Sequence, residues 1–341
     1  MGFGAIAPQA REEAYMAIGT ITRRRAILAA GASLAAPAVR AQAPYPAGQS
    51  VALVVALAPG GASDVIGRII TQGLQERLGG TFFLEHRPGG STSIAARHVA
   101  RARPDGSTLF LGSISTFTLT PLTMRNPGYD PINDFTHITQ ACESLFLLAA
   151  NPRWQSLEQL LDAARARPES ISYATWGIGT TSHLWMEDLC RRAGVRMLHV
   201  PYAGSPPAMT DTIAGRTDCL PALLAACKGH MEAGRLRGLA VPTATRPPQL
   251  PEVPTFIEKG FPDFVSTVWY SVQGPPGMPA PTVARIRDAL AQHFADPAVR
   301  AFMATQGMLP PEIGEGPLLA RIRRELTLHR ELMARAGVEP T

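Results

Sequence analysis

The sequence lacks the features that would attach it to nucleic acid. Its formal net charge is +5, but residues 1–41 hold five Arg and two Glu, so +3 of that charge belongs to this first segment. The remaining +2 is close to balance, and no Lys/Arg run interleaved with aromatic side chains follows. Only 17% of residues are charged against 45% hydrophobic, which favours a folded core over disorder. We expect no nucleic-acid partner.

Cysteine is scarce, and its spacing does not suit a metal. The chain has four cysteines and no CxxC, and Cys219 with Cys227 makes a poor metal site. An oxidising compartment would permit disulfides among Cys142, Cys190, Cys219 and Cys227, in three alternative pairings that the sequence does not distinguish. We favour small buried apolar roles for all four residues and expect no metal.

Catalytic signatures are also missing. The sequence has no G-x-S-x-G elbow, no G-x-x-x-x-G-K-[ST] phosphate loop and no H-E-x-x-H. Gly177-Ile178-Gly179 opens like a dinucleotide fingerprint, but Ser182 stands where the third glycine belongs, so we expect no nicotinamide cofactor. His183 could serve as a base beside Ser182 or Asp188, yet nothing in the sequence orients it as one. We expect a structural or ligand-contacting histidine and no enzyme activity.

No segment after residue 41 reaches the length of about 20 apolar residues that a membrane span needs. The first segment instead has the pattern of an export signal, with Arg23-Arg24-Arg25 before an Ala-rich apolar stretch of about 14 residues. Arg24-Arg25 followed by Ala-Ile-Leu resembles a twin-arginine signal. Cleavage is expected after Ala41, and Met16 is an alternative start. We therefore predict a periplasmic protein whose mature chain is not embedded in the membrane.

The rest of the chain alternates predicted strands and helices. At this length it suits two lobes of about 120 to 170 residues each. The predicted strands are 51–57, 82–85, 108–112, 171–174, 197–200 and 236–241, and the predicted helices begin near 63, 92, 157, 181, 206, 281 and 317. Ser63 and Ser205 are the expected helix caps. This order predicts parallel sheets with helices on both faces and a ligand at the carboxyl ends of the strands.

Three loops at those strand ends have the features of an anion-binding site. The loops are Pro59–Ser63, Ser113–Thr116 and Gly177–Thr180, each with Ser or Thr hydroxyls beside it. A glycine-rich loop at a helix start exposes unpaired N–H groups, and the helix dipole adds about half a positive charge. Two such loops across a cleft could hold carboxylates without any arginine.

Several motifs spread along the chain resemble one known family. They are Ala58-Pro59-Gly60-Gly61-Ala62-Ser63-Asp64, Glu85-His86-Arg87-Pro88-Gly89-Gly90, Pro104-Asp105-Gly106-Ser107-Thr108-Leu109, Tyr129 to Phe135, Tyr173 to Thr180 with His183, His199 to Pro206, and Leu250 to Thr255. From Tyr45 to about Pro340 the chain resembles the Bug family, the substrate-binding receptors of tripartite tricarboxylate transporters.

The resemblance implies a periplasmic-binding-protein-like α/β fold, with two α/β lobes and a ligand cleft between them. Lobe one would comprise residues 44–143 and 266–341, and lobe two residues 144–265. It implies capture of a small carboxylate and docking to membrane transporter subunits. The expected ligand-binding residues are Pro59, Gly60, Gly61, Ser63, Asp64, Ser113, Ser115, Thr116, Trp176, Gly177, Gly179, Thr180, His183, Tyr202, Gly204, Ser205 and Ala222.

Two departures from the family pattern bear on the ligand. Many relatives have an acidic residue in the segment matching Cys219–Leu223, where this chain has Pro221-Ala222, and relatives usually have a small residue where Trp176 stands. We therefore expect a compact or aromatic carboxylate without an amine, unless Asp64 or Glu187 turns inward. Trp176 packing away from the cleft is an equal alternative.

Two other classes of function remain open from the sequence. A solute sensor or adaptor for a signalling system would share every cleft residue. A hydrolase on the same frame would need a nucleophile, a base and an orienting group that converge in the cleft.

Overall fold

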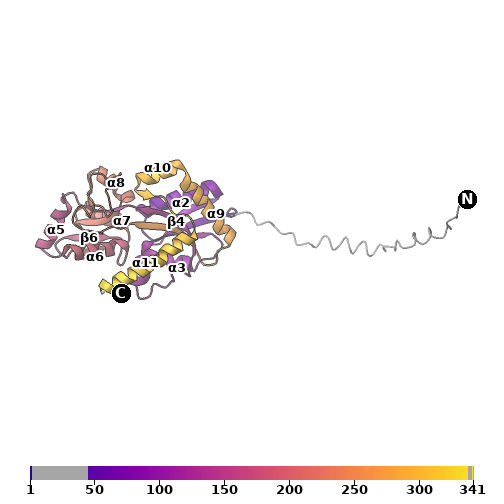
Figure 1. Cartoon of the computed structure of the whole chain (residues 1–341), viewed down its shortest axis with the longest axis horizontal. Coiled ribbons are helices and arrows are strands. Elements are labelled where there is room, and N and C mark those ends of the chain that lie inside the picture. Colours follow the sequence, from indigo (N-terminus) through magenta and orange to yellow (C-terminus); the bar gives the residue numbers. More distant parts are fainter. Residues whose placement is uncertain (2–44, 337–339, 341) are drawn as a thin grey trace. The chain divides into compact units, whose positions relative to one another are not determined.

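The computed structural model describes Met1, residues 45–336 and Pro340. Residues Pro44–Thr341 form one compact unit (Figure 1). The predicted export signal and its cleavage site lie outside the described residues.

The first sheet has six strands in the order β11-β4-β10-β3-β1-β2. Its strands are β1 (Ser50–Val55), β2 (Thr81–His86), β3 (Thr108–Ser113), β4 (Thr136–Ser144), β10 (Val268–Gly274) and β11 (Met308–Leu309). Val51 to Val55 are all buried, as expected of an apolar strand covered on both faces. β1 pairs in parallel with β2 and β3, whereas β10 runs antiparallel to β3 and β4.

The second sheet has five strands in the order β7-β6-β8-β5-β9. They are β5 (Phe146–Ala150), β6 (Ser172–Thr175), β7 (Leu198–Pro201), β8 (Cys219–Leu223) and β9 (Arg237–Ala240). β6 is parallel to β7 and β8, and β5 is antiparallel to β8 and β9.

The expectation of parallel sheets is wrong, because both sheets are mixed. One residue, Leu145, separates β4 from β5, so the chain enters the second sheet from the junction between the sheets. A strand that enters there must oppose β6 and β8, whose carboxyl ends point toward the junction. β10 returns from the second sheet in the same way, and its first residue, Val268, pairs with Ser144 at the end of β4.

Helices cover the sheets (Figure 1), and the seven predicted helices are present together with others that were not predicted. They are α2 (Ala62–Leu78), η3 (Gly90–Thr92), α3 (Ser93–Ala100), η4 (Ser115–Leu119), α4 (Thr120–Thr123), α5 (Leu157–Ala166), α6 (Thr181–Ala193), α7 (Ser205–Ile213), α8 (Leu224–Glu232), α9 (Ala280–Ala295), α10 (Pro297–Thr305) and α11 (Glu315–Ala336). α2 packs against α9, and α11, yellow in Figure 1, crosses β4.

The predicted serine caps are wrong. α2 begins at Ala62 with Gly61 as its N-cap, and α7 begins at Ser205 with Gly204 as its N-cap. No side chain caps either helix, because both serines lie one or two positions inside it, where their hydroxyls do not reach the first amides. The amides at these two helix starts therefore stay available to another acceptor.

All four cysteines are buried and free, as the preferred interpretation of their scarcity predicted. Burial raises the pKa of the Cys190 and Cys227 thiols to about 12, and the Glu187 charge adds to the rise at Cys190. These thiols are therefore neutral apolar groups that fill the core.

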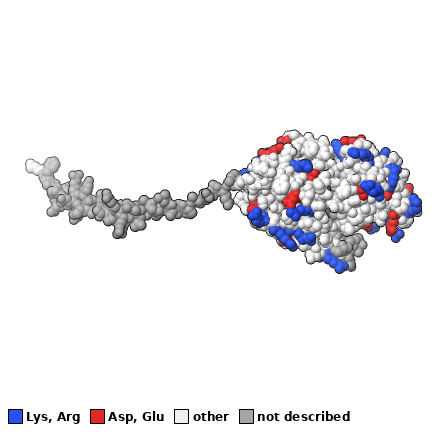
Figure 2. Space-filling view, turned by 180° about the vertical axis from the view of Figure 1, so that it is seen from behind, with Lys and Arg blue, Asp and Glu red and all other residues white. Residues whose placement is uncertain are grey.

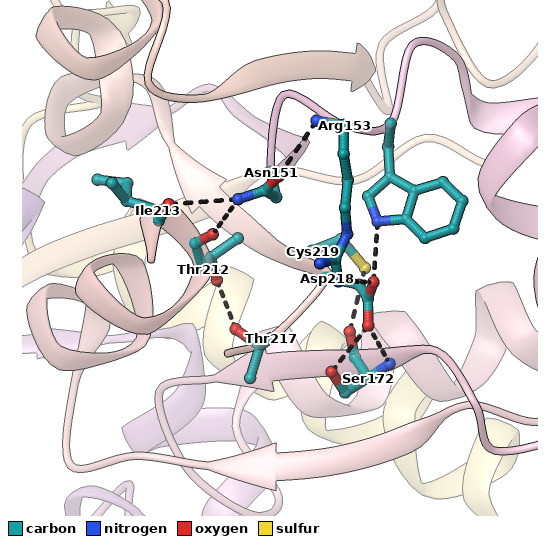
Figure 3. A network of polar contacts seen from close by, with 9 residues as sticks. Asn151, Arg153, Ser172, Thr212, Ile213, Thr217, Asp218 and Cys219 are labelled. Carbon is teal, nitrogen blue, oxygen red and sulfur yellow. Dashed lines mark hydrogen bonds and ion pairs between the residues drawn. The ribbon is translucent and has the colours of Figure 1, made fainter. Parts of the chain in front are cut away.

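A buried carboxylate fixes the end of the second sheet that faces away from the first (Figure 3). Asp218 Oδ2 accepts from the Ser172 amide at 2.8 Å and from the Ser172 hydroxyl at 3.0 Å. Its Oδ1 accepts from Trp154 Nε1 at 2.9 Å and pairs with Arg153. Asp218 thus ties the loop before α5 to the starts of β6 and β8, which sets the frame for the loops at their other ends.

Candidate ligand-binding site

The loops at the carboxyl ends of the two sheets meet across a cleft. The Ala58 amide donates to the Ala203 carbonyl at 3.4 Å. The Ser115 hydroxyl lies 3.0 Å from the Thr181 hydroxyl and accepts from the Thr181 amide at 3.2 Å. Ser91 donates to the Ile178 carbonyl. These contacts join segments of the first sheet to loops of the second and enclose a small space between them.

That space is a cavity of about 10 Å³. Its lining residues are Leu57, Ala58, Gly61, Ala62, Ser63, Trp176, Ser205, Pro206, Leu223 and Tyr270. The volume corresponds to about one water molecule. A ligand larger than a water molecule therefore does not fit this cavity as the structure has it.

The start of α2 offers free donors to this cavity. Within residues 45–336, no protein acceptor takes the amide hydrogens of Gly60, Gly61, Ala62 or Ser63. Gly61 has extended backbone geometry, and a Cβ there would lie 3.4 Å from Cδ of Pro206. A side chain no larger than that of alanine therefore fits where the α2 loop approaches the start of α7.

The start of α7 offers a second set of donors. In the described part of the chain, the Gly204 and Ser205 amides have no protein acceptor. Ser205 is 7% exposed, lines the cavity, and its hydroxyl is buried without a hydrogen-bond partner among the described residues. A buried hydroxyl without a partner is costly, so this group indicates an external acceptor.

The loop after β6 contrasts with these two starts, because most of its amides are already engaged. The Gly177 amide donates to the Thr175 hydroxyl at 3.4 Å, and the Gly179 amide donates to His183 Nδ1 at 3.1 Å. The Thr180 amide donates to the Gly177 carbonyl at 3.4 Å. Of this loop, only Trp176 is among the residues that line the cavity.

The His183 ring accepts a hydrogen bond from this loop. Its Nδ1 accepts from Gly179, so that nitrogen carries no proton, and its ring stacks on His199 with centroids 4.1 Å apart. Burial lowers the pKa of both rings, to about 4 for His199, where the nearby His183 lowers it further. Ser182 Oγ instead contacts the Trp176 amide and the Thr180 hydroxyl, so no Ser–His pair forms here.

The remaining expected residues lie around the cavity without lining it. Thr116 is buried with its hydroxyl unpaired, and the Tyr202 hydroxyl donates to Asp211 at 2.6 Å. Ala222 is buried within β8 opposite Leu147, and Ser113 ends β3 opposite Tyr270. Only Gly61, Ser63, Trp176 and Ser205 of the expected set line the cavity. Pro59, Gly60, Asp64, Ser113, Ser115, Thr116, Gly177, Gly179, Thr180, His183, Tyr202, Gly204 and Ala222 do not.

Sequence reasoning missed several lining residues. Tyr270 belongs to β10, a strand that no turn signal or alternation revealed, and it enters the cavity because β10 returns from the second sheet. Leu223 directly follows the Pro221-Ala222 pair, at which this chain departs from the family pattern, so the sequence already pointed to its segment. Burial raises the pKa of the Tyr270 hydroxyl well above its ordinary value, so it stays a neutral donor.

The two acids considered as partners for a ligand amine are engaged elsewhere. Asp64 contacts His86 Nε2 at 2.8 Å and Arg68 at 3.3 Å. His86 Nδ1 lies 2.8 Å from the Leu57 carbonyl. Glu187 accepts from the Tyr173 hydroxyl and lies 3.7 Å from His183.

No group of three or more His, Cys, Asp or Glu side chains among the described residues could hold a metal ion. None of the described helices is both long and apolar enough to cross a bilayer.

The two mixed sheets, their covering helices and the cleft at their facing ends define a periplasmic-binding-protein fold. Residues 66–327 match the family described as Tripartite tricarboxylate transporter family receptor, and the chain belongs to that family. It is 30% identical to protein BugT of Bordetella pertussis over 320 residues, which cover 91% of this chain and 96% of BugT.

Solved structures agree with this assignment. The periplasmic binding protein BugD matches 86% of this chain and 99% of its own, with TM-score 0.82 and 29% identity. R. palustris Rpa4515, solved with adipate, matches 87% of this chain and 100% of its own, with TM-score 0.83 and 31% identity. The Bug-family resemblance and the expected fold are confirmed.

Proposed function

We propose that this chain is a periplasmic receptor that captures a small carboxylate in the cleft and delivers it to membrane subunits of a tripartite transporter. Family membership supports the role, and the related Rpa4515 was solved with a carboxylate, adipate. In this proposal the chain binds its solute and catalyses no reaction on it.

One observation carries the proposal, namely two helix starts with free amides on one cavity. α2 places Gly61, Ala62 and Ser63, whose amides are free, on the cavity lining, and α7 places Ser205 there, whose amide and hydroxyl are free. Each helix start carries about half a positive charge and unpaired N–H groups, which is the arrangement that binds carboxylates. Closure of the cleft removes water and strengthens each of these hydrogen bonds.

The proposal includes an opening step. A cavity of about 10 Å³ has no room for even a short carboxylic acid. We propose that residues 44–143 with 266–341 form one lobe and residues 144–265 the other. They would rotate about the two strand crossings, β4 to β5 and β9 to β10. Ligand entry would break the contacts Ala58–Ala203, Ser91–Ile178 and Ser115–Thr181.

The proposed location and partner follow from the same family. The twin-arginine signal predicted over residues 1–41 would carry the chain to the periplasm and be cleaved after Ala41. The intact mass of exported protein checks the cleavage, because any other first residue than Gln42 would refute it. Co-purification with the membrane subunits of a candidate transporter tests docking, whereas capture by a signalling protein would indicate a sensor.

Native mass spectrometry of protein purified from the periplasm tests the central claim. The expected result is a retained carboxylic acid that dissociates on unfolding and that rebinds in calorimetry with a stoichiometry of about one. The recovered acid should be chemically unchanged after long incubation with the protein. Conversion of the acid would establish an enzyme, and failure of every carboxylic acid tested to bind would refute the proposed function.

A further inference from the structure

Residues 178–181, the bridging segment, contact the side of the molecule that is built on the first sheet. The Ile178 carbonyl accepts a hydrogen bond from the hydroxyl of Ser91, which lies in η3. The Thr181 amide donates to Ser115 Oγ at 3.2 Å, and both of these residues are buried. The closed arrangement of the cleft therefore depends on where the bridging segment lies.

Gly179, in the middle of the bridging segment, is held from two directions. A Cβ on this residue would lie 2.6 Å from Thr123 Oγ1, so its backbone packs against α4 at a distance that a side chain would prevent. Its amide donates to His183 Nδ1 at 3.1 Å. The His183 ring thus fixes the point at which the bridging segment meets α4.

The hydrogen bond from Gly179 exists in only one protonation state of the His183 ring. Nδ1 is the acceptor, so the neutral ring carries its proton on Nε2, which lies 3.7 Å from a carboxylate oxygen of Glu187. A protonated ring has a hydrogen on both nitrogens, and the Nδ1 hydrogen would face the hydrogen of the Gly179 amide. Protonation of His183 therefore requires the bridging segment to move away from the ring.

The titratable groups packed around His183 come from three elements. On α6, its own side chain is 19% exposed, and burial lowers its pKa while the charge of Glu187 acts in the other direction. On β7, His199 stacks on it, and burial together with the nearby His183 ring lowers the pKa of His199 to about 4. On β6, Tyr173 donates to Glu187. Other acidic and basic side chains are interspersed over the surface, as the face in Figure 2 shows, where solvent screens their charges.

We propose that His183 is a positioning residue for solute binding, whose neutral ring holds the bridging segment in the closed arrangement and whose protonation releases the segment and the solute. This inference rests on the proposed function and adds a proton as a regulator of the same cleft. Acid weakens binding, because closure requires the neutral ring. For one proton and an ordinary His pKa of about 6.5 in the open cleft, affinity should fall up to about tenfold from about pH 7.5 to about pH 5.5.

Calorimetry with adipate at these two pH values, on the full-length processed protein, compares two variants with the wild type. His183→Phe retains an aromatic ring beside His199 but removes the acceptor, and it should weaken binding about tenfold at neutral pH. His183→Asn places its Oδ1 where Nδ1 lies and accepts from Gly179 without titrating. It should rescue most of that loss and change less than about threefold on acidification. Protonation of adipate itself affects all three proteins alike.

The control and the contrary outcomes are distinct. His98→Asn, in the last turn of α3 and outside the cavity lining, should keep the wild-type pH dependence. Equal loss of affinity on acidification in His183→Asn and the wild type would overturn the inference, as would wild-type affinity in His183→Phe at neutral pH. Failure of His183→Asn to rescue binding at neutral pH would mean that the acceptor is not what the ring contributes, and would also overturn it.

Hydrogen exchange of the solute-free protein, followed by mass spectrometry, tests the bridging segment directly and decides the question even where adipate is not the solute. From about pH 7.5 to about pH 5.5, amides 178–181 of the wild type should lose about fivefold more protection than those of His183→Asn. Comparison of the two proteins cancels the intrinsic pH dependence of exchange. Equal changes in both would overturn the inference. If the segment responds as expected but no carboxylic acid binds or is retained, the proposed function alone fails.

Discussion

Substitutions at Gly61 offer the sharpest test of how the two helix starts work together. A Cβ placed on Gly61 would lie 3.4 Å from Pro206 Cδ, 3.6 Å from Pro206 Cγ and 3.7 Å from Ser205 Cβ. These distances are ordinary van der Waals contacts, so Gly61→Ala fits the closed cleft. The backbone of Gly61 has φ −93°, which alanine and valine both adopt without strain.

Gly61→Val should behave differently. Its two methyl groups extend beyond the Cβ into the space between Pro206 and the free amides of α2, where the carboxylate is proposed to lie. We expect a loss of about 2 kcal/mol in binding, which is about thirtyfold in affinity, against less than threefold for Gly61→Ala. Gly61 is buried where the α2 loop approaches Pro206, so the melting temperature of each variant is measured beside its affinity.

Calorimetry with the acid identified by native mass spectrometry measures both variants. Gly316→Val serves as the matched control, because a Cβ at Gly316 meets nothing within 4 Å. Wild-type affinity in Gly61→Val would refute the placement of the carboxylate at α2. Equal losses in Gly61→Ala and Gly61→Val would show that backbone freedom, and not crowding, is what the glycine contributes.

Three further predictions concern stability and export. Burial opposes ionisation of Asp218, but hydrogen bonds from Ser172, Arg153 and Trp154 outweigh it and hold its pKa below the ordinary value. Asp218→Ala should therefore lower the free energy of unfolding by about 2 to 3 kcal/mol at neutral pH, and chemical denaturation as a function of pH should show this difference shrinking as the carboxylate protonates. Burial lowers the folded-state pKa of His183 and His199, so their contribution is present above about pH 6.5 and is lost as the pH falls below it, for His199 down to about pH 4. A His199→Phe variant that keeps the ring stack should flatten part of that slope in thermal melts, and an unaltered slope would contradict the assignment. Replacing Arg24 and Arg25 with Lys should block export, as cell fractionation would show, and normal export would reject the twin-arginine interpretation.

The elements that the sequence predicted well are those whose signal is local. The helix Leu157–Ala166 matches its apolar periodicity, and the helix Ala62–Leu78 ends where Gly79-Gly80 follows. The sequence did not predict β10. This strand joins the first sheet about 120 residues after β4, the previous strand of that sheet, and its place depends on that return of the chain. Its Tyr270 could not be assigned to the site for the same reason.

The candidate site also has features with a local sequence signal and features without one. Glycine-rich loops at strand ends could be recognised as anion-binding loops, and the loop before α2 keeps its amides free. The loop after β6 looked equivalent in sequence, but His183 and Thr175 occupy its amides. Which amide finds an internal partner depends on side-chain positions that composition and spacing do not encode. Trp176 illustrates the point, since its place against the cavity became clear only in three dimensions.

The free backbone amides at the starts of α2 and α7 have an evolutionary consequence. Every residue except proline supplies an N–H, so the anchoring of a carboxylate survives most side-chain replacements around it. Changes at Trp176, Leu223 or Tyr270 can then reshape the wall without loss of the head-group contact. Single substitutions in the wall are therefore expected to change which solute fits while the carboxylate anchor stays in place. Such a family can diversify its ligands on one unchanged scaffold.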